Sequence, residues 1–438
     1  MKRTITKKLQ AWKNDPKRKP LILMGARQVG KTFVLKKFGE DQYTNTVYLN
    51  FEDNPRLCKL FEASLDPKMI LKALTIEMNT EIVEGKTLLI FDEIQECPNA
   101  LNSLKYFCEN VPEQHIAAAG SLLGVKLAHA KGFPVGKVQF LSLYPLSFFE
   151  FLEALKETRL KNFVEELKSI EPLLPNLHEK LLMYFKEYLF VGGMPEAVVE
   201  YSESQSVSKV REIQTAILDA YSLDFAKHAP KEQIMKINQV WSSIPSQLAK
   251  ENKKFIYSII REGARAKEFE VALQWLMEAG LIYKVPLIST PKIPLSAYAD
   301  LHTFKMYLVD VGLLGAMSHL SAKTILHENE LFQEFRGAIA ENYVAQELIH
   351  SQFPLFYWTS EGKAELDFII EQDDFIYPLE VKSGNSSKKK SLKVYGDTYH
   401  PELLIRSSPM NLRKDGEILN CPLYLIEELR SLIKFHRL

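Results

Sequence analysis

The segment GARQVGKT at residues 25–32 constrains the fold of this 438-residue chain more than any other part of it. Its spacing is G-x-x-x-x-G-K-T, in which glycines let the backbone wrap around phosphate oxygens and backbone N–H groups face the anion. The apolar run LILM precedes Gly25, and the helical stretch FVLKKFG follows Thr32. Because such a loop works between a strand and a helix N-terminus, the segment predicts a P-loop in an α/β fold.

The loop predicts an ATP site that contains a magnesium ion. The Lys31 ammonium is expected to neutralise the β- and γ-phosphates during catalysis, and the Thr32 hydroxyl is expected to ligate Mg²⁺. The residues expected to bind the nucleotide are Gly25, Ala26, Arg27, Gln28, Val29, Gly30, Lys31, Thr32 and, from another strand, Asp92. The alternative is a Gly-Lys turn on the surface, and the flanking strand and helix argue against it.

A second motif, LLIFDEIQ at residues 88–95, supplies the acidic strand end that such a loop requires. Asp92 follows a run of apolar residues, so it is expected to hold Mg²⁺ at the carboxyl end of a strand. Glu93 is expected to orient and deprotonate water, which favours nucleotide hydrolysis over phosphate transfer. Ser121 ends the run HIAAAGS and is either a γ-phosphate sensor or an ordinary turn residue.

The composition is that of a globular protein, with 46% hydrophobic and 25% charged residues. Lys+Arg and Asp+Glu both number 55, so any nucleic-acid site must be local. The cysteines form no CxxC pair, which argues against a disulfide framework and against a zinc ribbon. No apolar run approaches the ~18 residues that span a bilayer. The sequence therefore predicts a cytoplasmic protein without membrane contact.

The first third of the chain has the pattern of a parallel sheet covered by helices, because short β-branched runs alternate with helical stretches. The expected strands are Leu21–Met24, Thr46–Phe51, Thr87–Phe91, His115–Ala119 and Lys137–Leu141. Residues 145–220 then have amphipathic helical patterns. The segment Pro286–Pro294 contains three prolines and predicts a loop.

Residues 231–285 resemble a winged-helix module, because two or three helices are followed by a short strand after Gly280. The outward positions of the last helix include Lys267, Glu268, Glu270 and Gln274. Since duplex affinity is carried by Lys and Arg, this mixed charge favours packing or protein contact over DNA reading. Both alternatives stay open at this stage.

Near the C-terminus, AELDFIIEQDDFIYPLEVKS predicts two strands joined by a turn at Asp373-Asp374. This register sets Asp367 opposite Glu380, where two carboxylates repel unless a cation lies between them. The helix expected over residues 330–350 places Glu341 on an otherwise apolar face. A carboxylate there is costly unless it is paired or ligates a metal.

This set of residues resembles the PD-(D/E)xK nuclease core. In that core Glu341, Asp367 and Glu380 would bind a divalent metal, and Lys382 would position or activate water for phosphodiester attack. The alternative is a salt-bridge ladder on a solvated hairpin. Several lysines follow, and they would either meet a nucleic-acid backbone or stay solvated: Lys388, Lys389, Lys390 and Lys393.

Taken together, the ATP-site motifs resemble the AAA+ branch of P-loop NTPases. Over essentially its whole length the chain resembles bacterial and archaeal predicted ATPases that pair an AAA-type domain with a C-terminal domain of uncharacterised function. The segments that carry this resemblance are GARQVGKT, LNFED, LLIFDEIQ, AAAGS, PLSFFEFL and FVGGMPEAV. The family's Gly-Arg before PLSF is Gly136-Lys137 here. Lysine cannot reproduce a bidentate guanidinium contact, which argues against an arginine finger at this position.

The expected fold is α/β, with an AAA-like P-loop core at residues 1–144 and a helical lid at 145–220. A winged-helix-like domain is expected at 221–320, and a restriction-endonuclease-like domain at 321–438. The expected function is Mg²⁺-dependent ATP hydrolysis coupled to a nuclease-like domain that acts on nucleic acid. The alternative is a nucleotide-dependent signalling or interaction switch whose C-terminal domain binds without catalysis. A protein partner or a homo-oligomer is compatible with both.

Overall fold

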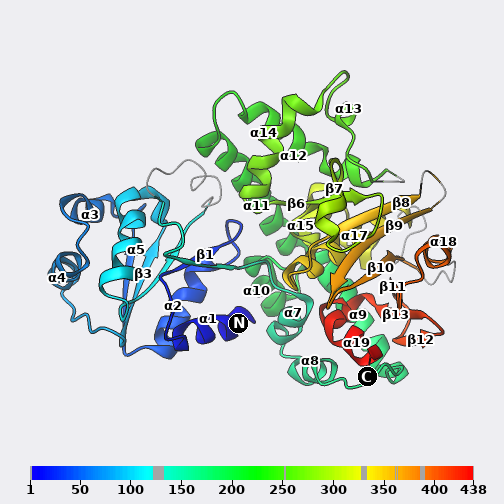
Figure 1. Cartoon of the computed structure of the whole chain (residues 1–438), viewed down its shortest axis with the longest axis horizontal. Helices are drawn as coiled ribbons and strands as arrows, with labels where there is room; N and C mark the ends of the chain where they lie inside the picture. The colour runs from blue at the N-terminus through cyan, green and yellow to red at the C-terminus, as the bar shows by residue number, and fades with distance from the viewer. Residues whose placement is uncertain are drawn as a thin grey trace. The chain divides into compact units, whose positions relative to one another are not determined.

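The computed structural model describes residues 2–121, 133–250, 253–326, 333–360, 362, 364–384 and 390–437 (Figure 1). The chain divides into two compact units. The N-terminal unit contains residues 2–144 together with 278–280, and the C-terminal unit contains residues 145–277 and 281–438. Every helix in the described ranges is too short or too polar to span a lipid bilayer.

The N-terminal unit is built around a five-stranded sheet in the order β2-β3-β4-β1-β5, and every neighbouring pair is parallel. Its strands are β1 (Leu21–Met24), β2 (Asn45–Asn50), β3 (Thr87–Asp92), β4 (His115–Ala119) and β5 (Gln139–Ser142). Its helices are α1 (Ile5–Asn14), α2 (Lys31–Gln42), α3 (Cys58–Ala63), α4 (Pro67–Glu77) and α5 (Pro98–Asn110), with short 3-10 turns at Pro55–Leu57 and Ile94–Glu96. The expected parallel α/β sheet is thus confirmed.

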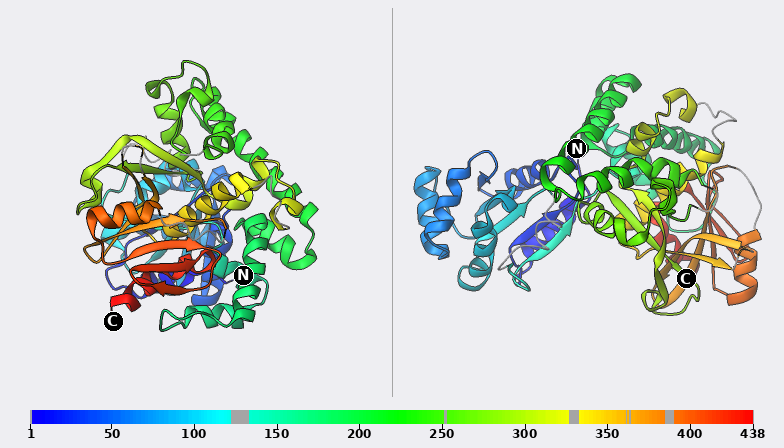
Figure 2. Two further views of the ribbon diagram at one scale, coloured as in Figure 1. Left: turned by 90° about the vertical axis from the view of Figure 1, so that its right-hand side faces the viewer. Right: turned by 90° about the horizontal axis from the view of Figure 1, so that it is seen from above.

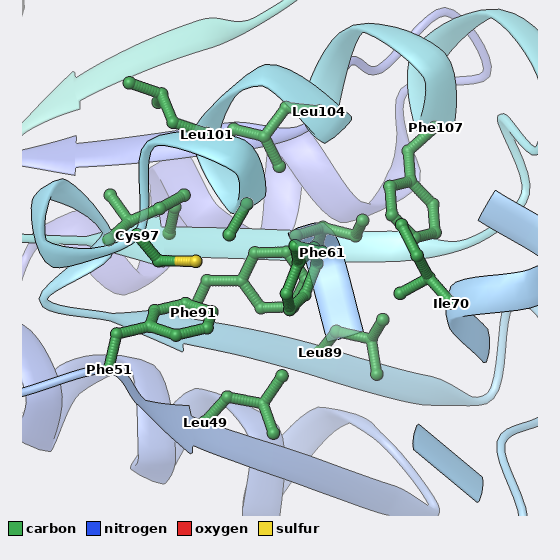
Figure 3. Close-up of a cluster of buried hydrophobic side chains, with 14 of the residues drawn as sticks. Leu49, Phe51, Phe61, Ile70, Leu89, Phe91, Cys97, Leu101, Leu104 and Phe107 are labelled. Carbon is green, nitrogen blue, oxygen red and sulfur yellow. The ribbon is translucent and has the colours of Figure 1, made fainter. Parts of the chain in front are cut away.

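The sheet is buried because helices cover both of its faces, and β3 and β4 are buried along their whole length. Figure 3 shows side chains of β3 meeting those of the helices α3, α4 and α5. Phe51, Phe61 and Phe91 pack edge to face, with ring centroids 5.5–5.8 Å apart. Cys97 lies in the same cluster, and burial raises the pKa of its thiol, as befits a structural cysteine. In this sheet β1 and β3 lie on either side of β4, so the carboxyl ends of all three parallel strands meet at the same edge.

The C-terminal unit begins with helices and continues with an eight-stranded mixed sheet (Figure 2). The helices before the sheet are α7 (Phe148–Ala154), α8 (Thr158–Glu165), α9 (Pro175–Val191), α10 (Pro195–Ser204), α11 (Val207–His228), α12 (Ile234–Leu248), α13 (Tyr257–Ile260) and α14 (Ala266–Glu278). The strands are β6 (Ile282–Ile288), β7 (Ala299–Leu308), β8 (Phe356–Ser360), β9 (Ala364–Gln372), β10 (Phe375–Val381), β11 (Leu404–Ser408), β12 (Arg413–Asp415) and β13 (Ile418–Pro422). The remaining helices are α15 (Val311–Met317), α16 (Ala322–Leu326), α17 (Gln333–His350), α18 (Lys390–Tyr399) and α19 (Leu429–Arg437), with 3-10 turns at Leu295–Tyr298 and Leu423–Glu428.

This sheet crosses the boundary expected between residues 320 and 321. Its order is β12-β13-β11-β10-β9-β8-β6-β7, so β6 and β7 extend the sheet formed by β8 to β13. β6 pairs in parallel with β8, with Leu287 opposite Tyr357 and Ile288 opposite Trp358. The helices α12 to α14 and the hairpin β6–β7 follow the expected helix-then-strand order. A separate winged-helix domain stays a prediction.

The start of the expected loop Pro286–Pro294 is instead part of strand β6, which runs to Ile288. The pairing of β6 with β7 shifts register between Pro286 and Leu287. Proline lacks the N–H that a regular ladder requires, and an irregularity in the pairing accommodates it.

The hairpin β9–β10 has the expected turn and register. Asp373 and Asp374 both have positive φ, 51° and 64°, as the two central residues of a type I′ turn require. The paired residues include Gln372 with Phe375 and Phe368 with Leu379. Continuing this register by one residue sets Asp367 opposite Glu380, so the two carboxylates are neighbours on adjacent strands.

Candidate functional site

The P-loop connects β1 to α2 in the N-terminal unit. Gly25 has φ +150°, and a Cβ atom there would lie 2.1 Å from the carbonyl oxygen of Leu143. Gly30 caps α2 in the left-handed region, with φ 92°. Both positions therefore need glycine for reasons of backbone geometry. The turn brings the N-terminus of α2 to the carboxyl end of the sheet, where backbone N–H groups favour a phosphate.

Lys31 is buried at the first position of α2. Its Nζ donates hydrogen bonds to the carbonyl oxygens of Gly25 at 3.0 Å and Ala26 at 2.8 Å. Burial lowers the pKa of this lysine to about 8, against the opposing charges of Glu93 and Asp92. A phosphate group beside Lys31 would supply a further negative charge and would raise the pKa again.

Asp92 ends β3 and joins the loop to the neighbouring strand. Its Oδ2 accepts hydrogen bonds from Thr32 Oγ1 at 2.7 Å and from the Tyr48 hydroxyl at 2.8 Å. Its Oδ1 accepts one from the Glu93 backbone N–H at 3.1 Å. The hydroxyl and carboxylate oxygens expected to hold Mg²⁺ are therefore adjacent. Both are hard oxygen donors, so the residues present fit a magnesium ion that completes its shell with phosphate and water.

Glu93 follows Asp92 in the left-handed conformation, with φ 48° and ψ 45°. Its Oε2 accepts hydrogen bonds from the Ser121 backbone N–H at 3.0 Å and from the Gln95 amide, and its Oε1 accepts one from the Ser121 hydroxyl at 3.1 Å. These donors hold the carboxylate in one position between the ends of β3 and β4. Ser121 thus contacts the expected base directly, whereas its role as a γ-phosphate sensor stays a prediction.

Sequence reasoning missed three residues that support this site. Tyr48 donates to Asp92 and Gln95 donates to Glu93, and both come from segments next to β3. Arg3 donates to the carbonyl oxygens of Val29 at 3.1 Å and Tyr144 at 2.6 Å. The motif LNFED flanks Tyr48 and is a local signal that could have identified it. For Arg3 no local pattern exists, because its partners are far away in the sequence.

The C-terminal residues predicted to form a metal site line one cavity of about 900 Å³. Glu341 comes from α17, Asp367 from β9, Glu380 from the end of β10 and Lys382 from just beyond it. Other residues around the cavity are Lys250, Ile256, Thr359, Gly362, Ala364, Glu365, Val381, Lys390 and Ser391. The structure therefore brings all four predicted residues together, while their metal and catalytic roles stay predictions. Lys393 is exposed on α18, and Lys388 and Lys389 lie outside the described residues.

Each of these carboxylates already has a protein partner. Lys382 forms an ion pair with Glu380 at 2.8 Å, and the Val381 backbone N–H donates to Asp367 Oδ2 at 2.8 Å. Lys253 forms an ion pair with Glu341 Oε1. Burial raises the pKa of both Glu341 and Glu380. Glu380 Oε2 is buried and has no hydrogen-bond partner among the described residues.

A fifth side chain, Lys305 of β7, was missed by sequence reasoning. Only 1% of its surface is exposed, and its Nζ lies 2.5 Å from Glu365, 3.6 Å from Asp367 and 4.0 Å from Glu341. Burial alone would lower the pKa of Lys305, but Tyr307 and these three carboxylates outweigh it and raise the pKa well above its ordinary value. Within the described ranges, no group of three Asp, Glu, His or Cys side chains has metal-ligand spacing.

Three family models match consecutive parts of the chain. Residues 17–152 match a family described as an AAA domain, residues 183–324 match a domain of unknown function, DUF8612, and residues 336–424 match another, DUF4143. The strands β6 and β7 lie in the second match and β8 to β13 in the third, although they form one sheet. No curated protein sequence matches the chain.

Several solved structures are similar to the chain at low identity. A Walker-type ATPase of Pyrococcus abyssi is 16% identical, with a TM-score of 0.44 over 72% of this chain and 94% of that one. The ORC1 protein of Aeropyrum pernix, solved in complex with DNA, is 14% identical, with a TM-score of 0.30 over 72% and 90%. The RuvB Holliday junction branch migration motor of Thermotoga maritima is 17% identical, with a TM-score of 0.30 over 64% and 89%.

The family match and the geometry of the loop together identify the N-terminal unit. The AAA model covers β1 to β5, the loop 25–32 and the strand end at Asp92. The N-terminal unit of this chain is therefore an AAA-type P-loop domain.

Proposed function

We propose that the N-terminal unit binds ATP with Mg²⁺ and hydrolyses it. The observation that carries this proposal is the position of Glu93, whose carboxylate is held by Ser121 beside the Thr32–Asp92 pair. A carboxylate fixed at that point can orient and deprotonate a water molecule. Lys31, at the N-terminus of α2, supplies the charge that opposes the β- and γ-phosphates.

In this proposal the chain's own residues divide the work. The P-loop backbone would bind the phosphates, and Thr32 and Asp92 would hold a magnesium ion, which would neutralise negative charge on the phosphates. Glu93 acts on the attacking water, and Ser121 and Gln95 keep Glu93 in place. Arg3 ties the loop carbonyl of Val29 to the carbonyl of Tyr144 and thereby stiffens the loop.

The direct test compares wild type with Lys31→Ala in binding a fluorescent ATP analogue and in releasing phosphate from ATP. We expect wild type to bind the ATP analogue and to hydrolyse ATP, both of them only when Mg²⁺ is present. We expect Lys31→Ala to show no detectable binding of the analogue. Lys37→Ala is the matched control, because Lys37 is an exposed lysine on the same helix that pairs with Asp41 at 2.8 Å. If a folded Lys31→Ala protein bound ATP as wild type does, the P-loop assignment would be rejected.

A second candidate function is nucleotide-controlled cleavage of nucleic acid at the C-terminal cavity, although the ammonium of Lys305 beside Asp367 and Glu341 argues against the divalent metal that this cleavage requires. The cavity gathers Glu341, Asp367, Glu380 and Lys382, and the buried Glu380 Oε2 lacks a protein donor in the described part of the chain. A nuclease assay with Mg²⁺ or Mn²⁺ that compares wild type with Asp367→Ala tests it. Cleavage by wild type that the substitution abolishes would support the nuclease. If wild type and Asp367→Ala gave the same amount of cleavage, the result would favour a switch that binds nucleic acid, a protein partner or a second copy.

A further inference from the structure

The carboxylates of the C-terminal cavity surround a buried ammonium group. Lys305 is nearly inaccessible to solvent, and Glu365, Asp367 and Glu341 lie within 4.0 Å of its Nζ. The Tyr307 hydroxyl on the same strand donates to Glu341 Oε2 at 3.4 Å. A buried ammonium without such partners would be strongly unfavourable, so Lys305 and these carboxylates depend on each other.

The alternation of side chains along β9 creates this arrangement. Leu366 packs in one cluster with Leu392 and Tyr395 of α18. Because successive residues of a strand point to opposite faces, Glu365 and Asp367 lie on the other face of the sheet. Lys305 reaches the same face from β7, two strands beyond β8. The sheet therefore supplies the lysine and two of the carboxylates.

The Asp367 and Glu341 oxygens that a metal would need are already engaged by the protein, and among the predicted ligands Glu380 Oε2 is the oxygen without a hydrogen-bond partner in the described residues. Asp367 uses Oδ1 for Lys305 and Oδ2 for the Val381 N–H, and Glu341 uses Oε1 for Lys253. A divalent ion bound by Asp367 and Glu341 would stand close to the Lys305 ammonium. At an effective dielectric constant of ~20, two like charges ~4 Å apart repel with far more energy than a tenfold change in affinity represents. The residues present therefore do not fit a divalent metal at this position.

We propose that the ammonium of Lys305 is the cation that neutralises Glu341, Glu365 and Asp367. It occupies the position at which a PD-(D/E)xK nuclease binds a divalent metal. The carboxylates of Glu341, Glu365 and Asp367 then hold β7, β9 and α17 together without a metal. The three carboxylates on this side of the cavity are then neutralised in part by lysines of the protein itself. This inference does not depend on ATP hydrolysis in the N-terminal unit, and the two can fail separately.

The test measures Mn²⁺ binding to the full chain by electron paramagnetic resonance, without nucleotide. All proteins carry Thr32→Ala, which removes one of the two oxygens expected to bind metal at the P-loop. We expect no tight Mn²⁺ site with Lys305 present. Lys305→Met should gain one site, with affinity at least about tenfold higher, because the repelling charge is gone and Glu365 and Asp367 Oδ1 lose their ammonium partner. Adding Glu341→Gln to Lys305→Met should abolish the gained site.

Lys250→Met is the matched control, because Lys250 lines the same cavity with an exposed side chain. It should leave Mn²⁺ binding at the low level of the parent. Lys305→Met leaves buried carboxylates without their partner, so its melting temperature should fall by several degrees and Mn²⁺ should recover part of the loss. If Lys305→Met does not fold, the double variant Lys305→Met with Glu365→Gln is measured in its place. It lacks the same ammonium but has one buried carboxylate fewer without a partner.

Two results would overturn the proposal. One is a parent protein that binds one Mn²⁺ tightly, loses it on Glu341→Gln and melts at a lower temperature in a chelator. The other is a folded Lys305→Met protein, alone or with Glu365→Gln, that gains no Mn²⁺ binding over the Lys250→Met control.

Discussion

Lys31 is a charged residue that the fold holds away from water. Two loop carbonyls, of Gly25 and Ala26, replace water as acceptors for its ammonium. Burial outweighs the attraction of the acidic residues after β3 and lowers the pKa of Lys31 to about 8. A phosphate group is a stronger partner than a carbonyl, so nucleotide binding and the protonation of Lys31 must be linked.

This linkage predicts the pH dependence of ATP binding. Since phosphate raises the pKa of Lys31, the complex binds the proton more tightly than the free protein does. Affinity should be constant from about pH 7 to pH 8 and should fall above that, by up to about tenfold per pH unit, until the pKa of the complex is reached. Titration with a fluorescent ATP analogue at a series of pH values measures the slope. Lys37→Ala should keep it, and an affinity that rises with pH above 8 would contradict the assignment.

Glu93 should separate binding from hydrolysis. Its carboxylate accepts from Ser121 and Gln95, whereas the Mg²⁺ contacts are assigned to Thr32 and Asp92. Glu93→Gln should therefore retain ATP affinity while turnover falls by on the order of 10² or more, the usual contribution of a positioned base. Phosphate release and equilibrium binding measured on the same preparation test this. Turnover near wild type in the variant would mean that another group activates the water.

At the scale of elements, the P-loop depends on backbone geometry more than on side chains. Gly25 approaches the Leu143 carbonyl so closely that a methyl group would overlap it. Gly30 adopts a left-handed conformation where α2 begins. Together they orient the N–H groups of the helix start, which give the loop its affinity for phosphate.

Gly25→Ala should therefore weaken ATP binding at least about tenfold, because the loop must move away from Leu143 to admit the Cβ atom. Gly85→Ala is the control: Gly85 also has positive φ, +72°, but a Cβ atom there meets nothing within 4 Å. Gly85→Ala carries the strain of a positive φ near the left-handed region, about 1 kcal/mol, whereas Gly25→Ala carries the strain of φ +150°, far from that region, and adds the clash with Leu143. The affinities of Gly25→Ala and Gly85→Ala for a fluorescent ATP analogue test this prediction. Equal affinities would show that the close approach is irrelevant to binding.

The β9–β10 hairpin is the element that organises the C-terminal cavity. Asp373 and Asp374 adopt left-handed conformations, which aspartate tolerates better than most residues. The two-residue turn sets the pairing of Gln372 with Phe375, and the rest of the register follows from it. A slip of one residue would turn Asp367 and Glu365 into the opposite face, among the apolar side chains beneath α18.

At the scale of the whole molecule, the eight-stranded sheet joins two segments that separate family models describe. β6 and β7 precede the expected boundary at residues 320 and 321, and β8 follows it. Lys253 and Lys305, which neutralise Glu341 and its neighbours, also precede that boundary. Strand pairing and ion pairs therefore both connect residues on the two sides of the expected boundary.

A fragment of residues 321–438 should therefore not fold by itself. It would expose the edge of β8 and leave Glu341, Glu365 and Asp367 without the ammonium of Lys305, a loss that costs about 3–5 kcal/mol for a buried pair. A fragment of residues 145–438 keeps both features and should fold. Circular dichroism melting curves of the two fragments show which of them unfolds in a cooperative transition. A cooperative transition in the shorter fragment would show that the boundary is a true domain border.

The amino-acid sequence was enough to predict the P-loop, the acidic end of β3, the five strands of the parallel sheet and the β9–β10 register, whereas the spatial order of those five strands came from the structure. Each of the predicted features is a local pattern, because glycine spacing, strand alternation and a two-residue turn act over a few residues. The pairing of β6 with β8, the contact of Arg3 with the P-loop and the position of Lys305 among three carboxylates became visible in the folded chain alone. These contacts join residues from about 26 to 70 positions apart, where the partner depends on how the layers pack and no short pattern specifies it.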